Sequence, residues 1–300
     1  MRIGLALGSG GLRGAAHIGV IDELERAGIC PHMVAGTSSG SLIAAMCGAG
    51  MSVAEMEEIA LGVQARDIID SPGTTLFYLA VPLALLFCGQ KSRLPKGMLR
   101  GARLESFLKA NFGDMKMTDM KMPCAVVSVD LHSGEKIVFT SEAVRSECFK
   151  GTVYVDGHVA DAVRASCSIP GVFFWKEWDG RYLVDGGVRE PVPARVLKEL
   201  GCDYVIAVDL GYTGQADSKV GDLPSIITQS LDILGEEVSD YVLFHYADVV
   251  VKPRLYNVAL TDVARIPECI EAGRRAAVEA LPAIRRGIRR RRIRGLAQLV

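Results

Sequence analysis

The sequence lacks the cysteine and histidine patterns of metal sites. Its 300 residues include eight cysteines and five histidines, but no two cysteines form a C-x-x-C pair and the histidines are not clustered. A structural zinc site needs four such ligands at short spacings, so no metal is expected. Isolated cysteines in apolar neighbourhoods pack as small hydrophobic side chains, and unpaired thiols fit the reducing cytoplasm.

A membrane-spanning run is also missing. The longest apolar stretch, residues 76–88, has 13 residues and is interrupted by Pro82, whereas a transmembrane helix needs about 20. Glycines break the apolar residues near the N-terminus, so no signal peptide is expected. Two interpretations of the stretch stay open: a buried helix, or a cap over residues 76–100 that lines an acyl-chain groove. Basic residues that would suit anionic head groups follow it: Lys91, Arg93, Lys96 and Arg100.

No repeat and no Pro- or Ser-rich linker divides the chain, which favours a single domain. With 49% hydrophobic residues and a mean hydropathy of +0.24, the chain can form a large core. Strand-like runs alternate with helical stretches, which predicts an α/β fold of three layers, α/β/α, around a central, mostly parallel sheet. The predicted strands are Ile3–Leu7, Met33–Ala35, Ala125–Val129, Lys136–Phe139, Tyr182–Val184, Tyr204–Asp209 and Asp248–Val251.

Helix ends have recognisable signals at three places. Gly28 and Gly201 stand where a glycine ends a helix. Ser52 and Glu55 have the spacing of a capping box, which predicts the start of another helix.

Charge is distributed unevenly along the chain. There are 34 basic and 35 acidic residues, yet seven arginines fall within residues 284–294. Such a run is typical of a solvated or disordered tail, and its isoleucines also allow a basic amphipathic anchor for an anionic membrane. No aromatic platform accompanies it, so nucleic acid is not expected as a partner. We therefore divide the chain into a main domain, 1–282, and a basic tail, 283–300.

Residues 36–40 read Gly-Thr-Ser-Ser-Gly and match the pattern G-x-S-x-G. They follow an apolar run and precede a helix-like stretch of small residues, which is the context of a nucleophile elbow. Gly36 and Gly40 allow the sharp strand-to-helix turn that would expose the Ser38 hydroxyl at a helix N-terminus. Ser38 is therefore the candidate nucleophile.

A second glycine cluster, residues 8–14 (Gly-Ser-Gly-Gly-Leu-Arg-Gly), follows the first predicted strand. Consecutive N–H groups in such a loop can hold negative charge. A dinucleotide site is disfavoured, because Arg13 stands where a third glycine belongs and no acidic residue closes the second strand. A phosphate loop ending in Gly-Lys-Ser/Thr is absent. We expect Gly8 to shape the loop, and Gly10 and Gly11 to stabilise an oxyanion formed at Ser38.

A serine nucleophile needs a base, and none of the five histidines follows a late strand as the base of a serine hydrolase usually does. The stronger candidate is Asp185, which ends a short strand and is followed by Gly186 and Gly187. A carboxylate can act as a general base when burial raises its pKa toward neutrality. An aspartate that only initiates a turn is the alternative.

The three motifs, in this order, resemble those of the patatin-like phospholipase family: G-x-G-G-x-R-G, G-x-S-x-G and D-G-G. The similarity covers residues 1 to about 255 and includes residues 127–131, 165–173 and 247–251. It implies that Ser38 is the nucleophile, that Asp185 is the base, and that Gly10 and Gly11 are oxyanion donors in a loop held by Arg13. The neighbouring serines are expected to pack or cap rather than react: Ser39, Ser41, Ser166 and Ser168.

The same resemblance implies a function. It points to a serine acyl hydrolase of lipid esters, of the phospholipase A or lysophospholipase type, with no metal or organic cofactor. The cysteine pattern adds the expectation of a cytoplasmic location, and the basic tail that of a peripheral membrane contact. The alternative is a catalytically silent adaptor that keeps the fold and binds a membrane through that tail.

Overall fold

The computed structural model describes residues 1–70, 97–142, 149–211, 223–256, 258 and 262–297. Within them, a nine-stranded sheet has the order β5-β4-β3-β2-β1-β8-β9, with β7 beside β3 and β6 beside β7. The strands are β1 (Ile3–Leu7), β2 (Met33–Thr37), β3 (Cys124–Asp130), β4 (Lys136–Thr140), β5 (Thr152–Tyr154), β6 (Lys176–Trp178), β7 (Arg181–Asp185), β8 (Tyr204–Val208) and β9 (Val249–Val251).

The sheet is mostly parallel, as the sequence predicts. The central strands β3, β2, β1, β8 and β9 run parallel to one another, and β4 runs parallel to β5. The pairs β3–β4, β3–β7 and β6–β7 are antiparallel. Ser38 and the glycine loop follow the carboxyl ends of the parallel strands β2 and β1, where ligands bind in open α/β sheets, whereas Asp185 ends the antiparallel strand β7.

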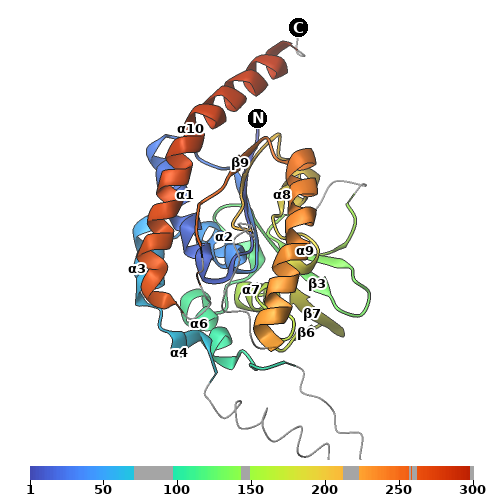
Figure 1. Cartoon of the computed structure of the whole chain (residues 1–300). Coiled ribbons are helices and arrows are strands. Elements are labelled where there is room, and N and C mark those ends of the chain that lie inside the picture. The colour runs from blue at the N-terminus through green and yellow to red at the C-terminus, as the bar shows by residue number, and fades with distance from the viewer. Residues whose placement is uncertain (71–96, 143–148, 212–222, 257, 259–261, 298–300) are drawn as a thin grey trace, which may run out of the picture.

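Helices cover both faces of the sheet, which confirms the three-layer prediction (Figure 1). On one face lie α1 (Ala16–Arg26), α2 (Ser39–Ala49), α3 (Val53–Gly62), α6 (Ala102–Phe112), α7 (Val159–Ser166) and α10 (Ile266–Ala297), and on the other lie α8 (Ala194–Glu199) and α9 (Leu223–Tyr246). The shorter helices are α4 (Ala65–Ile68) and the 3-10 turns η1 (Gly11–Ala15), η2 (Met117–Asp119), η3 (Gly186–Val188) and η4 (Val263–Arg265).

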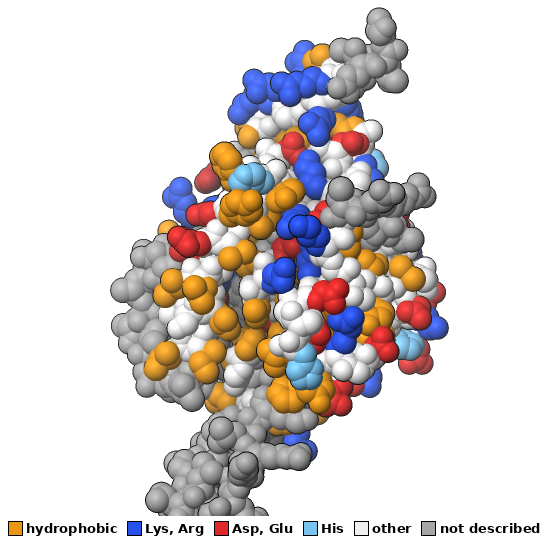
Figure 2. Space-filling model, turned by 90° about the vertical axis from the view of Figure 1, so that its right-hand side faces the viewer, with side chains coloured by type: hydrophobic (Ala, Val, Ile, Leu, Met, Phe, Trp, Pro, Cys, Tyr) orange, Lys and Arg blue, Asp and Glu red, His pale blue; other side chains and the backbone are white. Residues whose placement is uncertain are grey.

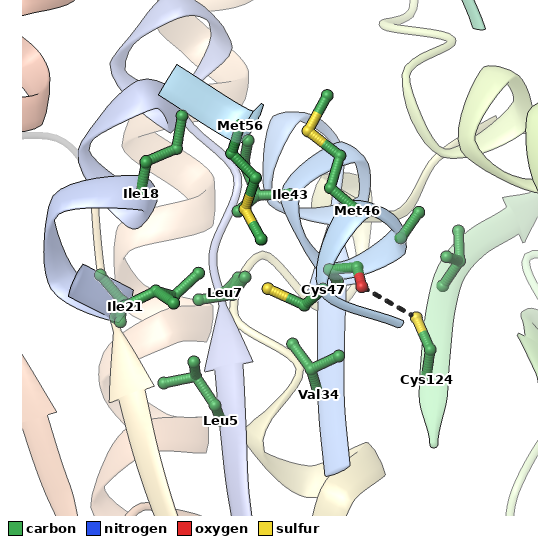
Figure 3. Close-up of a cluster of buried hydrophobic side chains, with 14 of the residues drawn as sticks. Leu5, Leu7, Ile18, Ile21, Val34, Ile43, Met46, Cys47, Met56 and Cys124 are labelled. Carbon is green, nitrogen blue, oxygen red and sulfur yellow. Dashed lines mark hydrogen bonds between the residues drawn. The ribbon is translucent and has the colours of Figure 1, made fainter. Parts of the chain in front are cut away.

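The alternating side chains of the strands build two separate cores. On β1, Leu5 and Leu7 point into the larger core, whereas Ala6 belongs to the smaller one beside α8. Figure 3 shows the larger core, where these leucines and Val34 of β2 meet Ile18 of α1. All of these side chains are at most 1% exposed. Burial of this apolar surface on both faces fixes which strand ends lie at the site.

The helix signals predicted from the sequence are confirmed. Ser52 and Glu55 form a capping box in which each side chain bonds the backbone N–H of the other. Gly28 and Gly201 follow the caps of α1 and α8 with φ angles of 70° and 86°, a backbone conformation that favours glycine.

Helices α1 and α10 touch backbone to backbone. A Cβ atom on Gly19 would overlap the carbonyl oxygen of Ile270, and one on Gly273 would overlap that of Ala16. Arg274 adds a polar fastening, since its Nε donates to the Asp22 carboxylate at 2.7 Å. The last long helix is thus fixed to the first one.

The basic segment expected as a tail continues helix α10, which runs through Pro282 without ending. Ile284 is fully buried, and the Tyr204 hydroxyl donates to its carbonyl oxygen at 3.4 Å. The boundary expected at residue 282 therefore lies inside a helix, because apolar packing of Ile284 and Ile288 outweighs the hydrogen bond that proline cannot donate. Beyond that contact the helix projects away from the body (Figure 1).

The apolar stretch 76–88 and most of the expected cap lie outside the described residues. The end of that segment, residues 97–100, is described: Leu99 pairs with Phe173, and its N–H donates to the Val172 carbonyl at 2.8 Å. Among the helices of the described residues, none combines the length and hydropathy that a bilayer crossing requires.

Most described cysteines pack as expected. Cys47, Cys124, Cys202 and Cys269 are buried, and all six described thiols are free. Cys30 is exposed. In the described part of the chain, no group of three or more His, Cys, Asp or Glu side chains could hold a metal ion.

Candidate active site

Strand β3 brings the two main candidate residues together. Thr37, the last residue of β2, lies opposite Val127, and Asp185, the last residue of β7, lies opposite the next residue, Ser128. Because β4 occupies the other edge of β3, β2 and β7 share one edge and meet end to end. Ser38 follows Thr37 directly, so the register of three strands sets it beside Asp185.

Ser38 occupies a strained turn between β2 and α2. Its φ and ψ are 55° and −127°, a region that costs a non-glycine residue about 1–3 kcal/mol. The turn is tight enough that a Cβ on Gly40 would overlap the Leu7 carbonyl oxygen, and one on Gly36 would overlap that of Gly40. This geometry is the nucleophile elbow expected from G-x-S-x-G.

Hydrogen bonds from neighbouring side chains hold the elbow. The Ser38 N–H donates to Ser166 Oγ at 2.9 Å, and Ser166 Oγ donates in turn to the Val127 carbonyl at 2.6 Å. Ser41 Oγ donates to the Ser38 carbonyl at 2.6 Å. Because these serines are buried and bonded to backbone atoms, they position the elbow, as expected from their predicted capping roles.

A buried ion-pair group lies behind the elbow. Thr37 Oγ1 donates to the Glu190 carbonyl at 2.9 Å. The Glu190 carboxylate pairs with Lys136 at 3.0 Å, and Lys136 also pairs with Glu199 at 3.1 Å. Removing one member of such a group leaves an unpaired buried charge, which typically costs about 3–5 kcal/mol. The sequence analysis did not identify these residues, because their partners are far apart in the chain.

Asp185 has the environment of a general base. It is 5% exposed, its N–H donates to the Ser168 carbonyl at 3.0 Å, and its Oδ1 accepts from the Gly187 N–H at 2.8 Å. Burial raises the pKa of this carboxyl to about 7, against the opposing effect of hydrogen bonds from the Ser38 side chain and the Gly187 backbone. A carboxylate that titrates near neutrality and bonds the serine hydroxyl can remove its proton.

The segment before Asp185 is fastened by a buried arginine. Arg164, 2% exposed, donates to Ser168 Oγ at 2.7 Å and to the Arg100 and Phe174 carbonyls at 2.8 and 3.2 Å. Burial lowers the pKa of its guanidinium. A charged residue among the apolar residues of α7 is the signal that could have identified it.

The glycine loop follows β1 and lies beside the site. Gly8 donates to the Val208 carbonyl at 3.0 Å, Gly10 is extended, and Gly11 has a φ of 55°. In the described part of the chain, no hydrogen bond engages the N–H groups of Gly10 and Gly11.

Arg13 acts on the loop through its backbone. Its N–H and Nε donate to the Gly10 carbonyl at 3.1 and 3.2 Å, and Nη1 donates to the Gly211 carbonyl at 3.4 Å. Nη2 pairs with Asp232 of α9 at 3.4 Å. This arrangement agrees with the expected role of Arg13 in holding the loop. Asp232 is a residue that sequence reasoning missed, and its charge also raises the pKa of Asp185.

The remaining motif glycines make close contacts near the base. A Cβ on Gly186 would overlap the Val127 carbonyl oxygen, and one on Gly187 would lie 3.0 Å from Asp185 Oδ1. Gly186 therefore needs the smallest residue to keep β7 against β3, whereas a side chain at Gly187 would press on the Asp185 carboxylate.

The five histidines bond elsewhere. His17 Nε2 donates to the Gly8 carbonyl at 2.8 Å, and burial lowers the pKa of its ring to about 4. Ring nitrogens of His32, His158 and His245 bond to the Ile3 N–H, the Asp114 carbonyl and the Tyr241 carbonyl respectively. The backbone N–H of His132 donates to the Asp130 carboxylate at 3.3 Å. None of these bonds involves Ser38.

The raised pKa of Asp185 has a consequence for stability. Between pH 4 and 7 the carboxyl of Asp185 has lost its proton in the unfolded chain and keeps it in the folded one. The free energy of unfolding therefore falls as pH rises through this range. Above about pH 7 the contribution of this group falls no further. Asp185→Asn removes that penalty. We expect the variant to be more stable than the wild type at pH 8, by on the order of 2–4 kcal/mol, and nearly equal at pH 4.

Thermal unfolding across this pH range checks the expectation. The exposed Asp114→Asn serves as the control, with no pH-dependent gain. A gain in Asp185→Asn that was the same at pH 4 and pH 8 would contradict the linkage.

Comparisons with known proteins agree with the fold. Residues 5–198 match the family model described as patatin-like phospholipase. An uncharacterised NTE family protein of Mycobacterium tuberculosis is 32% identical over 209 residues, 70% of this chain and 49% of that protein. Patatin-like phospholipase domain-containing protein 6 of Mus musculus is 30% identical over 226 residues, 73% of this chain and 14% of that protein.

A solved structure shows the same architecture. VipD from Legionella pneumophila superposes with a TM-score of 0.51 at 14% sequence identity, covering 94% of this chain and 66% of that one. The chain spans about half the length of the mycobacterial relatives it matches.

Proposed function

Because the chain belongs to the patatin-like phospholipase family, we propose that it is a serine hydrolase of lipid esters with Ser38 and Asp185 as a catalytic dyad. One observation carries the proposal. Ser38 lies on a strained elbow, and its side chain acts on the pKa of the buried Asp185 carboxyl, which burial raises to about 7.

The first half-reaction forms an acyl-enzyme. Asp185 takes the proton of the Ser38 hydroxyl as Ser38 Oγ attacks the ester carbonyl. The N–H groups of Gly10 and Gly11 donate to the tetrahedral oxyanion. The oxyanion then collapses, the bond to the leaving alcohol breaks, and Asp185 returns the proton to that alcohol.

The second half-reaction releases the fatty acid. Water replaces the alcohol, Asp185 takes a proton from it, and the resulting hydroxide attacks the acyl carbonyl. The second tetrahedral oxyanion uses the same two donors. Its collapse frees the carboxylic acid and restores the Ser38 hydroxyl, so the base serves both steps.

Labelling tests the proposal directly. A fluorophosphonate probe should modify the wild type at Ser38 and leave Ser38→Ala unlabelled. Mass spectrometry of the products from a panel of phospholipids and lysophospholipids then identifies the head group and acyl position. An unlabelled wild type that still bound lipid vesicles would favour the adaptor alternative.

We further propose that the arginines at the end of α10 bring the enzyme to anionic membranes. Figure 2 shows basic side chains gathered at the end of the molecule where this helix leaves the body. Each basic residue near an anionic surface contributes about 1 kcal/mol, and the effect decays within a Debye length.

Replacing all seven arginines by glutamine should abolish most cosedimentation with anionic vesicles at low salt and leave hydrolysis of a soluble short-chain ester nearly unchanged. Added salt should mimic the substitution in the wild type. Truncation at Pro282 is a poor substitute, because it also removes the buried Ile284. Vesicle binding that survived the sevenfold replacement would assign membrane contact to another surface.

A further inference from the structure

A groove of about 750 Å³ lies between the second half of α10 and the loop that joins α1 to β2. It opens beside Ile3 and His32, at the amino ends of β1 and β2. Ser38 follows the carboxyl end of β2, so the groove and the dyad lie at opposite edges of the sheet. Figure 1 shows the N-terminus beside this part of α10. The volume falls within the roughly 300–1,000 Å³ of pockets that hold small organic ligands.

The helix divides its arginines between two faces. Arg285, Arg289 and Arg292 line the groove and follow the i, i+4, i+7 spacing of one helical face. The other four arginines do not line it: Arg286, Arg290, Arg291 and Arg294. The groove face is therefore a defined part of the run.

The lining combines positive charge with an apolar surface. Ile3 and Ile29 are 5% and 7% exposed and lie across from Ile288 of α10. None of the residues that line the groove is acidic. Within the described part of the chain, no carboxylate pairs with the three groove arginines, and Arg285 donates to the Ala27 carbonyl at 3.5 Å. Most of their donors remain for a ligand.

His32 adds a neutral donor. Its Nδ1 accepts the Ile3 N–H at 3.2 Å, so in the neutral ring the hydrogen is on Nε2. The groove thus presents guanidinium and imidazole donors at its edge and isoleucine side chains at its base.

We propose that this groove binds an anion that has a hydrocarbon chain, with the charged head on Arg285, Arg289 and Arg292 and the chain on Ile3, Ile29 and Ile288. Carboxylates and phosphates both match the guanidinium fork, and the apolar base favours a chain over a free inorganic anion. Binding at this site requires neither Ser38 nor Asp185, so it stands independently of the proposed reaction.

Titration of the full chain with dodecanoate and dodecyl phosphate, below their micellar concentrations, tests the proposal. Ser38→Ala is the background, so no turnover intervenes. Replacing Arg285, Arg289 and Arg292 by glutamine should weaken binding at least tenfold. The matched control replaces Arg286, Arg290 and Arg294 by glutamine, which changes the net charge equally on the same helix, and should weaken binding less than twofold.

The exposed thiol of Cys30 lines the groove. Its reactivity can therefore report whether the anion binds there. Dodecanoate should slow its alkylation by a maleimide, read by peptide mass spectrometry, while acetate should not. Where the groove-face variant fails to fold, Cys30→Asp places a carboxylate in the groove without touching α10, and it should weaken binding at least tenfold.

Several results would overturn the proposal. Equal weakening by the two triple variants would show adsorption to the whole arginine run. Binding of dodecanol or dodecyltrimethylammonium as tight as that of the anions would show that charge recognition is missing, as would failure of both anions to bind. Preference for dodecanoate would identify a free fatty acid as the ligand, and preference for dodecyl phosphate a phosphate-headed lipid.

Discussion

Replacing Ser38 by alanine should lower the turnover of a soluble short-chain ester by about 10⁴-fold or more, and Asp185→Asn should do nearly the same. In the proposed reaction the hydroxyl and the carboxylate act in the same step, so the double variant should be little worse than either single one. All three variants should keep a cooperative thermal transition.

Ser39→Ala is the matched control, because this neighbouring serine opens α2 and its buried hydroxyl has no hydrogen-bond partner in the described part of the chain. It should retain turnover within a few fold. If Ser38→Ala kept more than a few per cent of the wild-type rate, another nucleophile would be responsible. A histidine whose loss matched that of Asp185 would contradict the dyad.

Added bulk in the glycine loop should have the next largest effect. A Cβ on Gly10 would lie 2.9 Å from that of Leu210, and Gly11 has a φ of 55°, where side chains are strained. Gly10→Ala and Gly11→Ala should each lower turnover about 10²-fold and change KM little, because the N–H groups donate most strongly to the oxyanion of the transition state.

Gly180→Ala separates catalysis from backbone strain. Gly180 has a φ of 72° with open space around it, in the turn between β6 and β7. It should lose stability to a similar degree as Gly11→Ala and keep normal turnover. Weaker binding of a non-reactive ester analogue in the loop variants, by the same factor as their loss of turnover, would indicate a displaced loop instead.

The sequence predicted the fold because most strands are buried runs of apolar residues. All seven predicted strands are present, and β2 extends two residues further, to Thr37. The two strands that were missed, β5 and β6, have three residues each and are only partly buried. Two of the three residues of β6 are charged, Lys176 and Glu177, so no apolar run marks this strand in the sequence.

The candidate site was predictable where its chemistry is local. The elbow around Ser38 and the turn after Asp185 each have a short motif with a physical reason. No local motif predicts that Ser38 and Asp185 lie close together, because this depends on β2 and β7 sharing one edge of β3. The bond from Ser38 to Ser166 joins residues 128 positions apart, which no periodicity reveals.

The basic run shows a different limit. Taken by themselves, Pro282 and the seven arginines that follow it indicate a tail exposed to solvent. The burial of Ile284 against the body depends on the position of Tyr204, whose hydroxyl donates to the Ile284 carbonyl, so only the folded chain shows why the helix continues.

The close backbone packing of α1 and α10 at Gly19 and Gly273 also bears on how the protein is made. A ribosome adds about 5–20 residues per second, and roughly 250 residues separate these glycines, so α1 emerges some tens of seconds before the helix that covers it. During that interval the nascent chain keeps an apolar helix face open to solvent and to chaperones. A ribosome that stalled before α10 would hold a chain with the glycine loop, α1 and the elbow already synthesised, but without the helix that packs against α1.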